Sequence, residues 1–225
     1  MGGKSTVEKL GSIKKSKSLA DKAYDTIKEA IIYNKLKPGE ILAEEKLVEE
    51  LNISRTQIRS ALYKLVFEEI AFINKNKNVI VSDITQKDID DIFFIRESLE
   101  PLSVSLLKDK ITKSQIEDLK NKYIEQLHTI EQFDGYSFIE LDYDFHNTIS
   151  EYTGNSFLNE TIKKAALVTK RFLILSGTVP QYSVIANKEH KEIIDYIERG
   201  QFKEASESML RHLKNVKEKI LRKNT

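Results

Sequence analysis

Apolar positions recur every three or four residues along most of this 225-residue chain, the spacing typical of helices that bury one face. In the first third, the pattern predicts helices that begin after Ser18, cover residues 44–51 and begin after Ser54. Lys37-Pro38-Gly39 predicts a turn between the first two helices. Asn52 can take the left-handed backbone conformation that a tight turn before the third helix needs.

Two β-rich runs, at residues 70–74 and 79–82, follow the third helix and predict a hairpin with a polar, basic tip. Three helices followed by a two-stranded hairpin describe a winged helix-turn-helix. We therefore expect such a DNA-binding domain over residues 18–82. A flexible basic arm, rich in Lys, Ser and Gly, is expected to precede it at residues 1–17.

From Thr85 onward the chain shows helical periodicity to its end. Thr85 and Asp88 predict a capping box at the first of these helices, and Gly200 predicts the turn between the last two. The expected helices cover residues 85–107, 113–131, 136–152, 156–175, 183–199 and 202–222. The predicted fold class is mainly α, an N-terminal winged helix-turn-helix followed by an all-helical antiparallel bundle over residues 83–225.

Composition changes this picture in three respects. The whole chain has a net charge of +1, but residues 1–80 carry 15 Lys and Arg against 11 Asp and Glu, a weak indication of nucleic acid at the front. The absence of Cys excludes disulfides and thiolate metal sites. No apolar run reaches about eighteen residues and no signal peptide precedes the first helix, so we predict a cytoplasmic protein that contacts no membrane.

The third helix offers polar side chains in its first turn and a half, away from its apolar face. Such positions on a recognition helix meet base edges and phosphates in the major groove. Two lysines at the hairpin tip would reach the neighbouring backbone or the minor groove. Each of these side chains by itself could simply be a polar residue on a solvent-exposed helix face. Together with the wing, they predict contact with double-stranded DNA. The predicted contacts are Ser54, Arg55, Thr56, Gln57, Arg59, Lys75 and Lys77.

Three of the four histidines fall where a helical bundle can bring them together. His190 lies ten residues before Gly200, and His212 lies about ten residues after the turn, so both would lie about 15 Å from the end of an antiparallel helical hairpin. Asp142 and His146, four residues apart, share one face of an earlier helix. One carboxylate and three imidazoles suit Zn²⁺, Ni²⁺, Fe²⁺ or Mn²⁺. The sequence therefore predicts a divalent metal site at these four residues.

The expected winged helix-turn-helix domain contains a motif that reads LKPGEIL at residues 36–42 and ISRTQIRSAL at residues 53–62. This motif resembles that of the GntR family of bacterial transcription regulators, whose head binds operator DNA as a dimer. The resemblance implies that Arg55 and Arg59 are the main DNA-contacting pair. The chain departs from the family pattern at Asn52 (usually Gly), Gln57 (usually Pro), Ser60 (usually Glu) and Asn78 (often Gly).

The all-helical region at residues 83–225 resembles the FCD ligand-binding domain of the FadR-type members of that family. Matching positions include Arg96, Glu100, the run DYDFH at 142–146, Glu189-His190 and the run RHL at 211–213. Members with this Asp and three His hold a metal inside the bundle and bind small carboxylates beside it. The resemblance thus implies a homodimer with a small organic acid as effector. Arg96 would clamp the effector carboxylate, or would form an internal ion pair with Glu100, four residues later.

Two functions remain open at this point. One is a repressor or activator whose effector shifts the orientation of two heads in a dimer and so changes operator affinity. The other is a metal-dependent enzyme acting on a small carboxylate, because such a metal can activate water. No free Glu, His or Lys is evidently placed as a general base, and protein ligands fill the site. We therefore expect a regulator without catalytic residues.

Overall fold

The computed structural model describes residues 17–177 and 179–222. The chain divides into two compact units, one formed by residues 1–30 and 38–82 and the other by residues 31–37 and 83–225. The arm expected at residues 1–17 lies outside the described residues except for Lys17, whose Nζ pairs with Asp25 at 2.7 Å.

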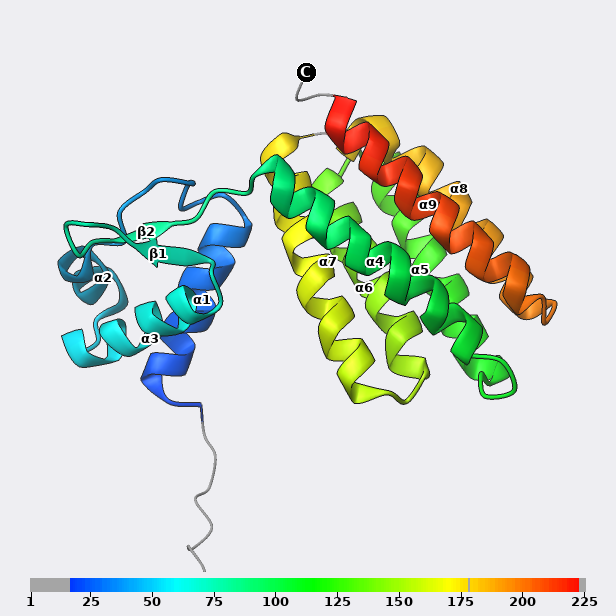
Figure 1. Ribbon diagram of the computed structural model, residues 1–225, viewed down its shortest axis with the longest axis horizontal. Coiled ribbons are helices and arrows are strands. Elements are labelled where there is room, and N and C mark those ends of the chain that lie inside the picture. Colours follow the sequence, from blue (N-terminus) through cyan, green and yellow to red (C-terminus); the bar gives the residue numbers. More distant parts are fainter. Residues whose placement is uncertain (1–16, 178, 223–225) are drawn as a thin grey trace, which may run out of the picture. The chain divides into compact units, whose positions relative to one another are not determined.

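The described part of the N-terminal unit consists of helices and one small antiparallel hairpin (Figure 1). Its elements are α1 (Leu19–Ile32) as far as Ala30, α2 (Glu44–Leu51), α3 (Arg55–Phe67), β1 (Ala71–Ile73) and β2 (Val79–Val81). Ala71 pairs with Val81 and Ile73 with Val79, and a single bridge from Ile41 to Ile80 adds a third segment beside β2. Helices followed by a two-stranded wing confirm the predicted winged helix-turn-helix. β1 is one residue shorter than expected at each end, and β2 begins as expected but ends one residue earlier.

Local sequence explains how α2 and α3 are joined. Asn52 ends α2 in the left-handed conformation, with φ of 51°, as predicted. Ser54 caps α3, whose buried face carries Ile58, Leu62 and Leu65. Because those apolar residues face the core, the polar positions of the first turn of α3 remain at the surface.

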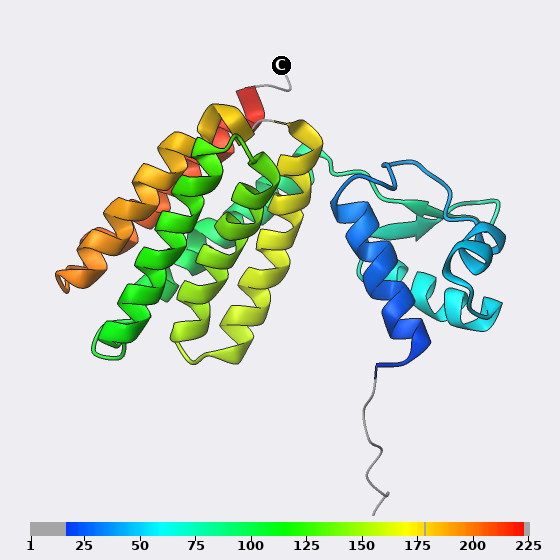
Figure 2. The same ribbon diagram turned by 180° about the vertical axis from the view of Figure 1, so that it is seen from behind.

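The C-terminal unit is a bundle of antiparallel helices (Figures 1 and 2). They are α4 (Gln86–Leu106), α5 (Lys113–Glu131), α6 (Gly135–Tyr152), α7 (Ser156–Ser176), α8 (Val179–Glu198) and α9 (Phe202–Arg222). α9 packs on α4 and α8, α7 packs on α4 and α6, and α5 packs on α6 and α8. The predicted fold class is thus confirmed.

The helix ends follow from recognisable local signals. Thr85 and Asp88 form the predicted capping box at α4, and Gly200, with φ of 71°, turns the chain from α8 into α9. α8 begins four residues before the predicted position, at Val179. Pro180 is compatible with this earlier start because the first turn of a helix needs no backbone N–H donor.

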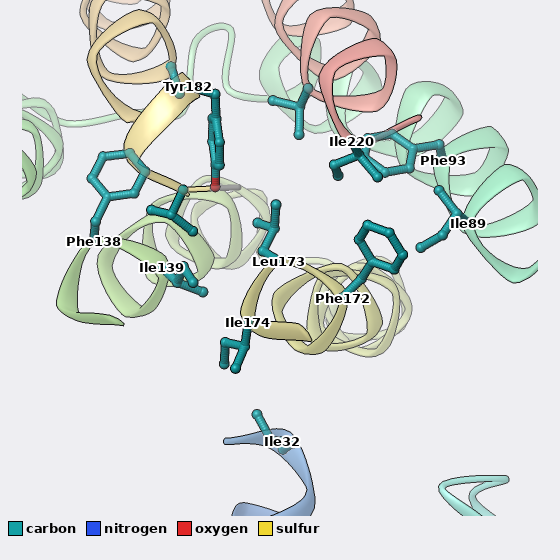
Figure 3. Close-up of a cluster of buried hydrophobic side chains, with 13 residues drawn as sticks. Ile32, Ile89, Phe93, Phe138, Ile139, Phe172, Leu173, Ile174, Tyr182 and Ile220 are labelled. Carbon is teal, nitrogen blue, oxygen red and sulfur yellow. The ribbon is translucent and has the colours of Figure 1, made fainter. Parts of the chain in front are cut away.

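Two clusters of buried apolar residues fill the bundle. Figure 3 shows the first, in which Phe93 of α4, Leu173 of α7, Tyr182 of α8 and Ile220 of α9 contribute side chains. The second joins α4, α5, α6, α8 and α9 through Val104, Leu119, Phe145, Ile193, Met209 and Leu213. Buried polar residues also lie on α4, α6, α8 and α9, and they need partners inside the bundle.

Candidate DNA-binding surface and metal centre

The predicted DNA contacts lie on two elements of the N-terminal unit. Ser54, Arg55, Thr56 and Arg59 are exposed at the start of α3, and Lys75 and Lys77 are exposed in the turn of the wing. Gln57 is half-buried, and its Oε1 accepts a hydrogen bond from the Ser54 backbone N–H at 3.1 Å. The side chain of Gln57 therefore closes the capping box of α3 in this structure.

Both arginines of α3 are held by acidic residues at the start of α2. Arg55 Nη2 lies 3.0 Å from Glu45 Oε1. Arg59 Nε lies 2.9 Å from each carboxylate oxygen of Glu44. Sequence reasoning did not identify these partners, because helical periodicity does not reveal which residues of two different helices face each other.

The side chain of Asn74 stabilises the turn of the wing. Asn74 Oδ1 accepts hydrogen bonds from the backbone N–H groups of Asn76 and Asn78, at 3.0 and 2.9 Å. Lys77 adopts a left-handed conformation with φ of 62°. Its side chain and that of Lys75 are therefore presented at the outer end of the hairpin, exposed to solvent.

The four predicted metal ligands meet inside the helical unit. Asp142 and His146 come from α6, His190 from α8 and His212 from α9, and all four side chains are buried. One ligand atom from each lies within 4.8 Å of the others. The antiparallel hairpin around Gly200 brings His190 and His212 to matching height.

The Nε2 atoms of the three imidazoles point toward one another. His212 Nε2 lies 3.3 Å from both His146 Nε2 and His190 Nε2, and His190 Nε2 lies 3.6 Å from Asp142 Oδ1. Nitrogen ligands about 2.0–2.1 Å from one metal ion are separated by about 2.9–3.4 Å in tetrahedral or octahedral geometry. The spacing of these nitrogens fits a shared ion.

Hydrogen bonds to the opposite ring nitrogens decide the tautomers of two histidines. Gln126 Nε2 donates to the Leu141 carbonyl at 3.1 Å, so its Oε1 faces His190 Nδ1 at 2.8 Å as an acceptor. Glu189 Oε2 likewise faces His212 Nδ1 at 2.8 Å. Both Nδ1 atoms must then carry hydrogen, and both Nε2 atoms present lone pairs. Two facing lone pairs cannot form a hydrogen bond, so a cation between them would remove their repulsion.

The third histidine contacts an acidic residue of α4. His146 Nδ1 lies 2.5 Å from Glu100 Oε2, but the two atoms are not aligned as a hydrogen bond. Glu100 Oε1 accepts from Arg96 Nε at 2.6 Å, and both side chains are buried. Burial favours the neutral acid, but the charge of Arg96 and the contact with His146 outweigh it and lower the pKa of Glu100 to about 2. Of the two roles predicted for Arg96, the structure contains the ion pair with Glu100.

Electrostatics favour neutral imidazoles at His190 and His212. Burial, reinforced by the neighbouring imidazoles, lowers the pKa of His190 well below its usual range. Burial also lowers the pKa of His212, although Glu189 acts in the opposite direction. Asp142 Oδ1 is buried and has no hydrogen-bond partner within the described residues. Neutral imidazoles beside an unsatisfied carboxylate oxygen are the state that a divalent metal binds.

Sequence reasoning missed Gln126 as a partner of the cluster. A signal for it exists, because Leu119, Tyr123, Gln126 and Ile130 follow one helical stripe in which only position 126 has an amide side chain. Two other residues that the sequence analysis did not assign to the site lie outside the cluster. Asp144 is exposed and pairs with Lys122, and His128 is exposed and lies 3.5 Å from Glu131.

Comparison with known proteins gives consistent matches over both units. The family model of the bacterial regulatory proteins of the gntR family matches residues 19–81, and that of the FCD domain matches residues 91–215. In the described parts of the chain, no helix combines the length and the apolar character needed to span a membrane.

Relatives and solved structures match over most of their length. The HTH-type transcriptional regulator YdhC of Bacillus subtilis (strain 168) is 24% identical over 84% of this chain and 85% of its own length. The HTH-type transcriptional repressor RspR of Escherichia coli (strain K12) is 23% identical over 88% and 86%, respectively. The structure of E. coli McbR/YncC superposes with a TM-score of 0.81 at 18% identity, covering 93% of this chain and all of that one. The chain therefore belongs to the GntR family, as a DNA-binding transcriptional regulator that joins a GntR winged helix-turn-helix domain to an FCD domain.

Proposed function

We propose that this regulator binds operator DNA as a homodimer and responds to a small organic acid bound beside a divalent transition metal. Asp142, His146, His190 and His212 would hold the metal, with Zn²⁺, Ni²⁺, Fe²⁺ and Mn²⁺ as candidates. The observation that carries this proposal is the convergence of three Nε2 atoms whose rings are oriented by contacts at Nδ1. Bound metal would supply a Lewis-acidic position for a carboxylate.

DNA recognition would use Ser54, Arg55, Thr56, Gln57, Arg59, Lys75 and Lys77. The arginines suit guanine edges and phosphates, and the wing lysines suit the adjacent backbone. We propose cytoplasmic localisation because the DNA partner is there. Repression is the proposed direction of control, in keeping with RspR and with the gluconate operon transcriptional repressor of Bacillus licheniformis, to which the chain is 29% identical over 65% of its length.

Two buried polar groups near the cluster support an effector site. Arg96 is buried on α4 and is proposed as the clamp for the effector carboxylate. The Tyr182 hydroxyl is buried without a hydrogen-bond partner among the described residues. Burial raises the pKa of Tyr182 far above its usual range, and the charge of Asp142 adds to that rise. The hydroxyl therefore remains protonated and can donate to an anion.

The arrangement does not favour the enzyme alternative. General base catalysis would need a free titratable group beside the metal. The carboxylates adjacent to the cluster within the described residues are already engaged, Glu100 by Arg96 and His146, and Glu189 by His212 and Asn215. We therefore propose that bound metal serves effector recognition.

Titration of metal-loaded protein with small carboxylates tests the effector proposal. We expect at least one mono-, di- or hydroxycarboxylate to change the affinity for operator DNA, and Arg96→Lys to lose that response while retaining metal. Lysine keeps the charge opposite Glu100 but lacks the planar fork that binds a carboxylate through two bonds. The readouts are fluorescence anisotropy on labelled DNA and elemental analysis. If no carboxylate alters DNA affinity with metal loaded, the effector proposal fails.

Gln126→Leu is expected to weaken metal binding by about 10- to 100-fold, because His190 loses the acceptor that orients its ring. Competition with a chromogenic chelator measures the affinity. The visible spectrum of the Co²⁺ form reports the ligand geometry, which a purely structural role of Gln126 would not alter. Gln126→Glu restores an acceptor at Nδ1 and should recover part of the loss. Equal metal affinities of wild type and Gln126→Leu would contradict the proposed role.

A further inference from the structure

A surface hollow of about 290 Å³ lies on the N-terminal unit, between the start of α2, the start of α3 and the wing turn. Figure 1 shows these three segments gathered at one end of that unit. Arg55 and Lys77 line the hollow from two different elements, and Glu44 and Glu45 line it from α2. The hollow is thus lined both by basic side chains that can bind a DNA phosphate and by carboxylates.

The two glutamates differ in their surroundings. Both oxygens of Glu44 contact Arg59 Nε, and its side chain is 32% exposed, so Glu44 is already engaged by Arg59 and is the less exposed of the two. The side chain of Glu45 is 82% exposed, and among the described residues its one ion pair is with Arg55, whose side chain is 54% exposed. Because water competes with such an exposed pair, the contact contributes little to folding. We expect the pair to matter when Arg55 binds another anion, such as a DNA phosphate.

A carboxylate and a phosphate offer similar oxygen pairs to a guanidinium group, and each can bind it through charge-assisted hydrogen bonds. The Glu45 carboxylate therefore occupies a position at Arg55 that a DNA phosphate oxygen would take. When DNA binds, Arg55 must exchange one anion for the other.

We propose that Glu45 is an intramolecular competitor of DNA phosphate at Arg55, which lowers the sequence-independent affinity of this regulator for DNA. The proposal rests on the proposed contact between Arg55 and DNA. Non-specific binding depends almost entirely on phosphate contacts, whereas operator binding adds contacts to bases. The Arg55 contact is therefore a larger part of the non-specific binding free energy, and the competition by Glu45 is best measured on DNA of arbitrary sequence.

The test compares full-length wild type and Glu45→Gln on a fluorescein-labelled duplex of arbitrary sequence, by anisotropy at several salt concentrations. We expect Glu45→Gln to bind about 3- to 10-fold more tightly at low salt. In the variant, Arg55 neutralises a DNA phosphate without leaving a carboxylate, so one more counterion is released from the DNA. The slope of log K against log salt should therefore steepen by up to about one. Glu50→Gln is the matched control, since Glu50 lies in the same helix and faces Lys46 at 3.8 Å. It changes the net charge equally and should have little effect.

Two further variants separate the steps of the argument. Arg55→Gln should weaken binding, and adding Glu45→Gln to it should bring no gain, because Glu45 acts through Arg55. A normal affinity of Arg55→Gln would overturn the Arg55 contact itself. If Arg55→Gln is weakened but Glu45→Gln binds like wild type, the competitor role alone is wrong. Equal gains from Glu45→Gln and Glu50→Gln, or a gain that persists without Arg55, would show a general charge effect and also overturn the proposal.

Discussion

Replacing His190 by alanine is expected to remove bound metal from this protein. His190 is fully buried, and its Nε2 lies 3.3 Å from His212 Nε2 and 3.6 Å from Asp142 Oδ1. Without this ligand, three donors remain and the ring that faces Gln126 is gone. Elemental analysis after desalting should find about one divalent metal per wild-type chain and almost none in the variant.

Metal should also raise the stability of the wild type, because a ligand that binds only the folded state stabilises it. Metal at 100 times its Kd adds about 2.7 kcal/mol to the free energy of unfolding. The thermal shift on adding metal should disappear in His190→Ala. His190 stacks on Phe145, with ring centroids 4.2 Å apart, so truncation also leaves a cavity. Asp142→Asn keeps the volume while removing the anionic ligand, and it should lower metal content without that cavity.

His128→Ala provides the control for the metal experiments. His128 is the one histidine of the chain outside the predicted ligand set, exposed on α5 and 3.5 Å from Glu131. Its loss should change neither the metal content nor the thermal shift. A wild-type protein that contains no metal even after loading would refute the site. Equal metal content in His190→Ala and wild type would refute the ligand set.

The second large effect is expected on DNA. The double substitution Arg55→Gln and Arg59→Gln should weaken operator binding by about 1–3 kcal/mol per arginine if each reads a base. If either arginine contacts only phosphate, its loss should weaken binding to all sequences alike and reduce the salt dependence. Comparing the two single variants on operator and arbitrary duplexes assigns each arginine to base or phosphate.

Arg199→Gln is a suitable control for these variants, because Arg199 is exposed at the end of α8 in the other unit. It removes the same charge and should leave DNA affinity unchanged. Circular dichroism should show unaltered helix content in all variants, since both arginines of α3 are exposed and their ion pairs contribute little to folding. Undiminished operator affinity of the double variant would contradict the proposed role of α3.

Local patterns in the sequence determined most of the secondary structure and the fold class. The helix cap at Ser54, the capping box at Thr85, the left-handed Asn52 and the turn at Gly200 involve residues close in the chain. Such signals depend on backbone preferences and on hydrogen bonds within one turn, so the sequence shows them directly. The start of α8 was misplaced because Pro180 is equally compatible with a loop and with the first turn of a helix.

The tertiary structure alone decided which further polar groups contact the residues of the candidate sites. Gln126 and His190 are 64 residues apart, and His146 meets Glu100 of another helix. Glu45 meets Arg55 across two helices. Periodicity indicates which face of a helix is buried, but it does not indicate which opposing face covers it. The sequence thus determined the residue types of the candidate sites, whereas packing of the helices decided their tautomers, their ion pairs and the acidic partners of the arginines on α3.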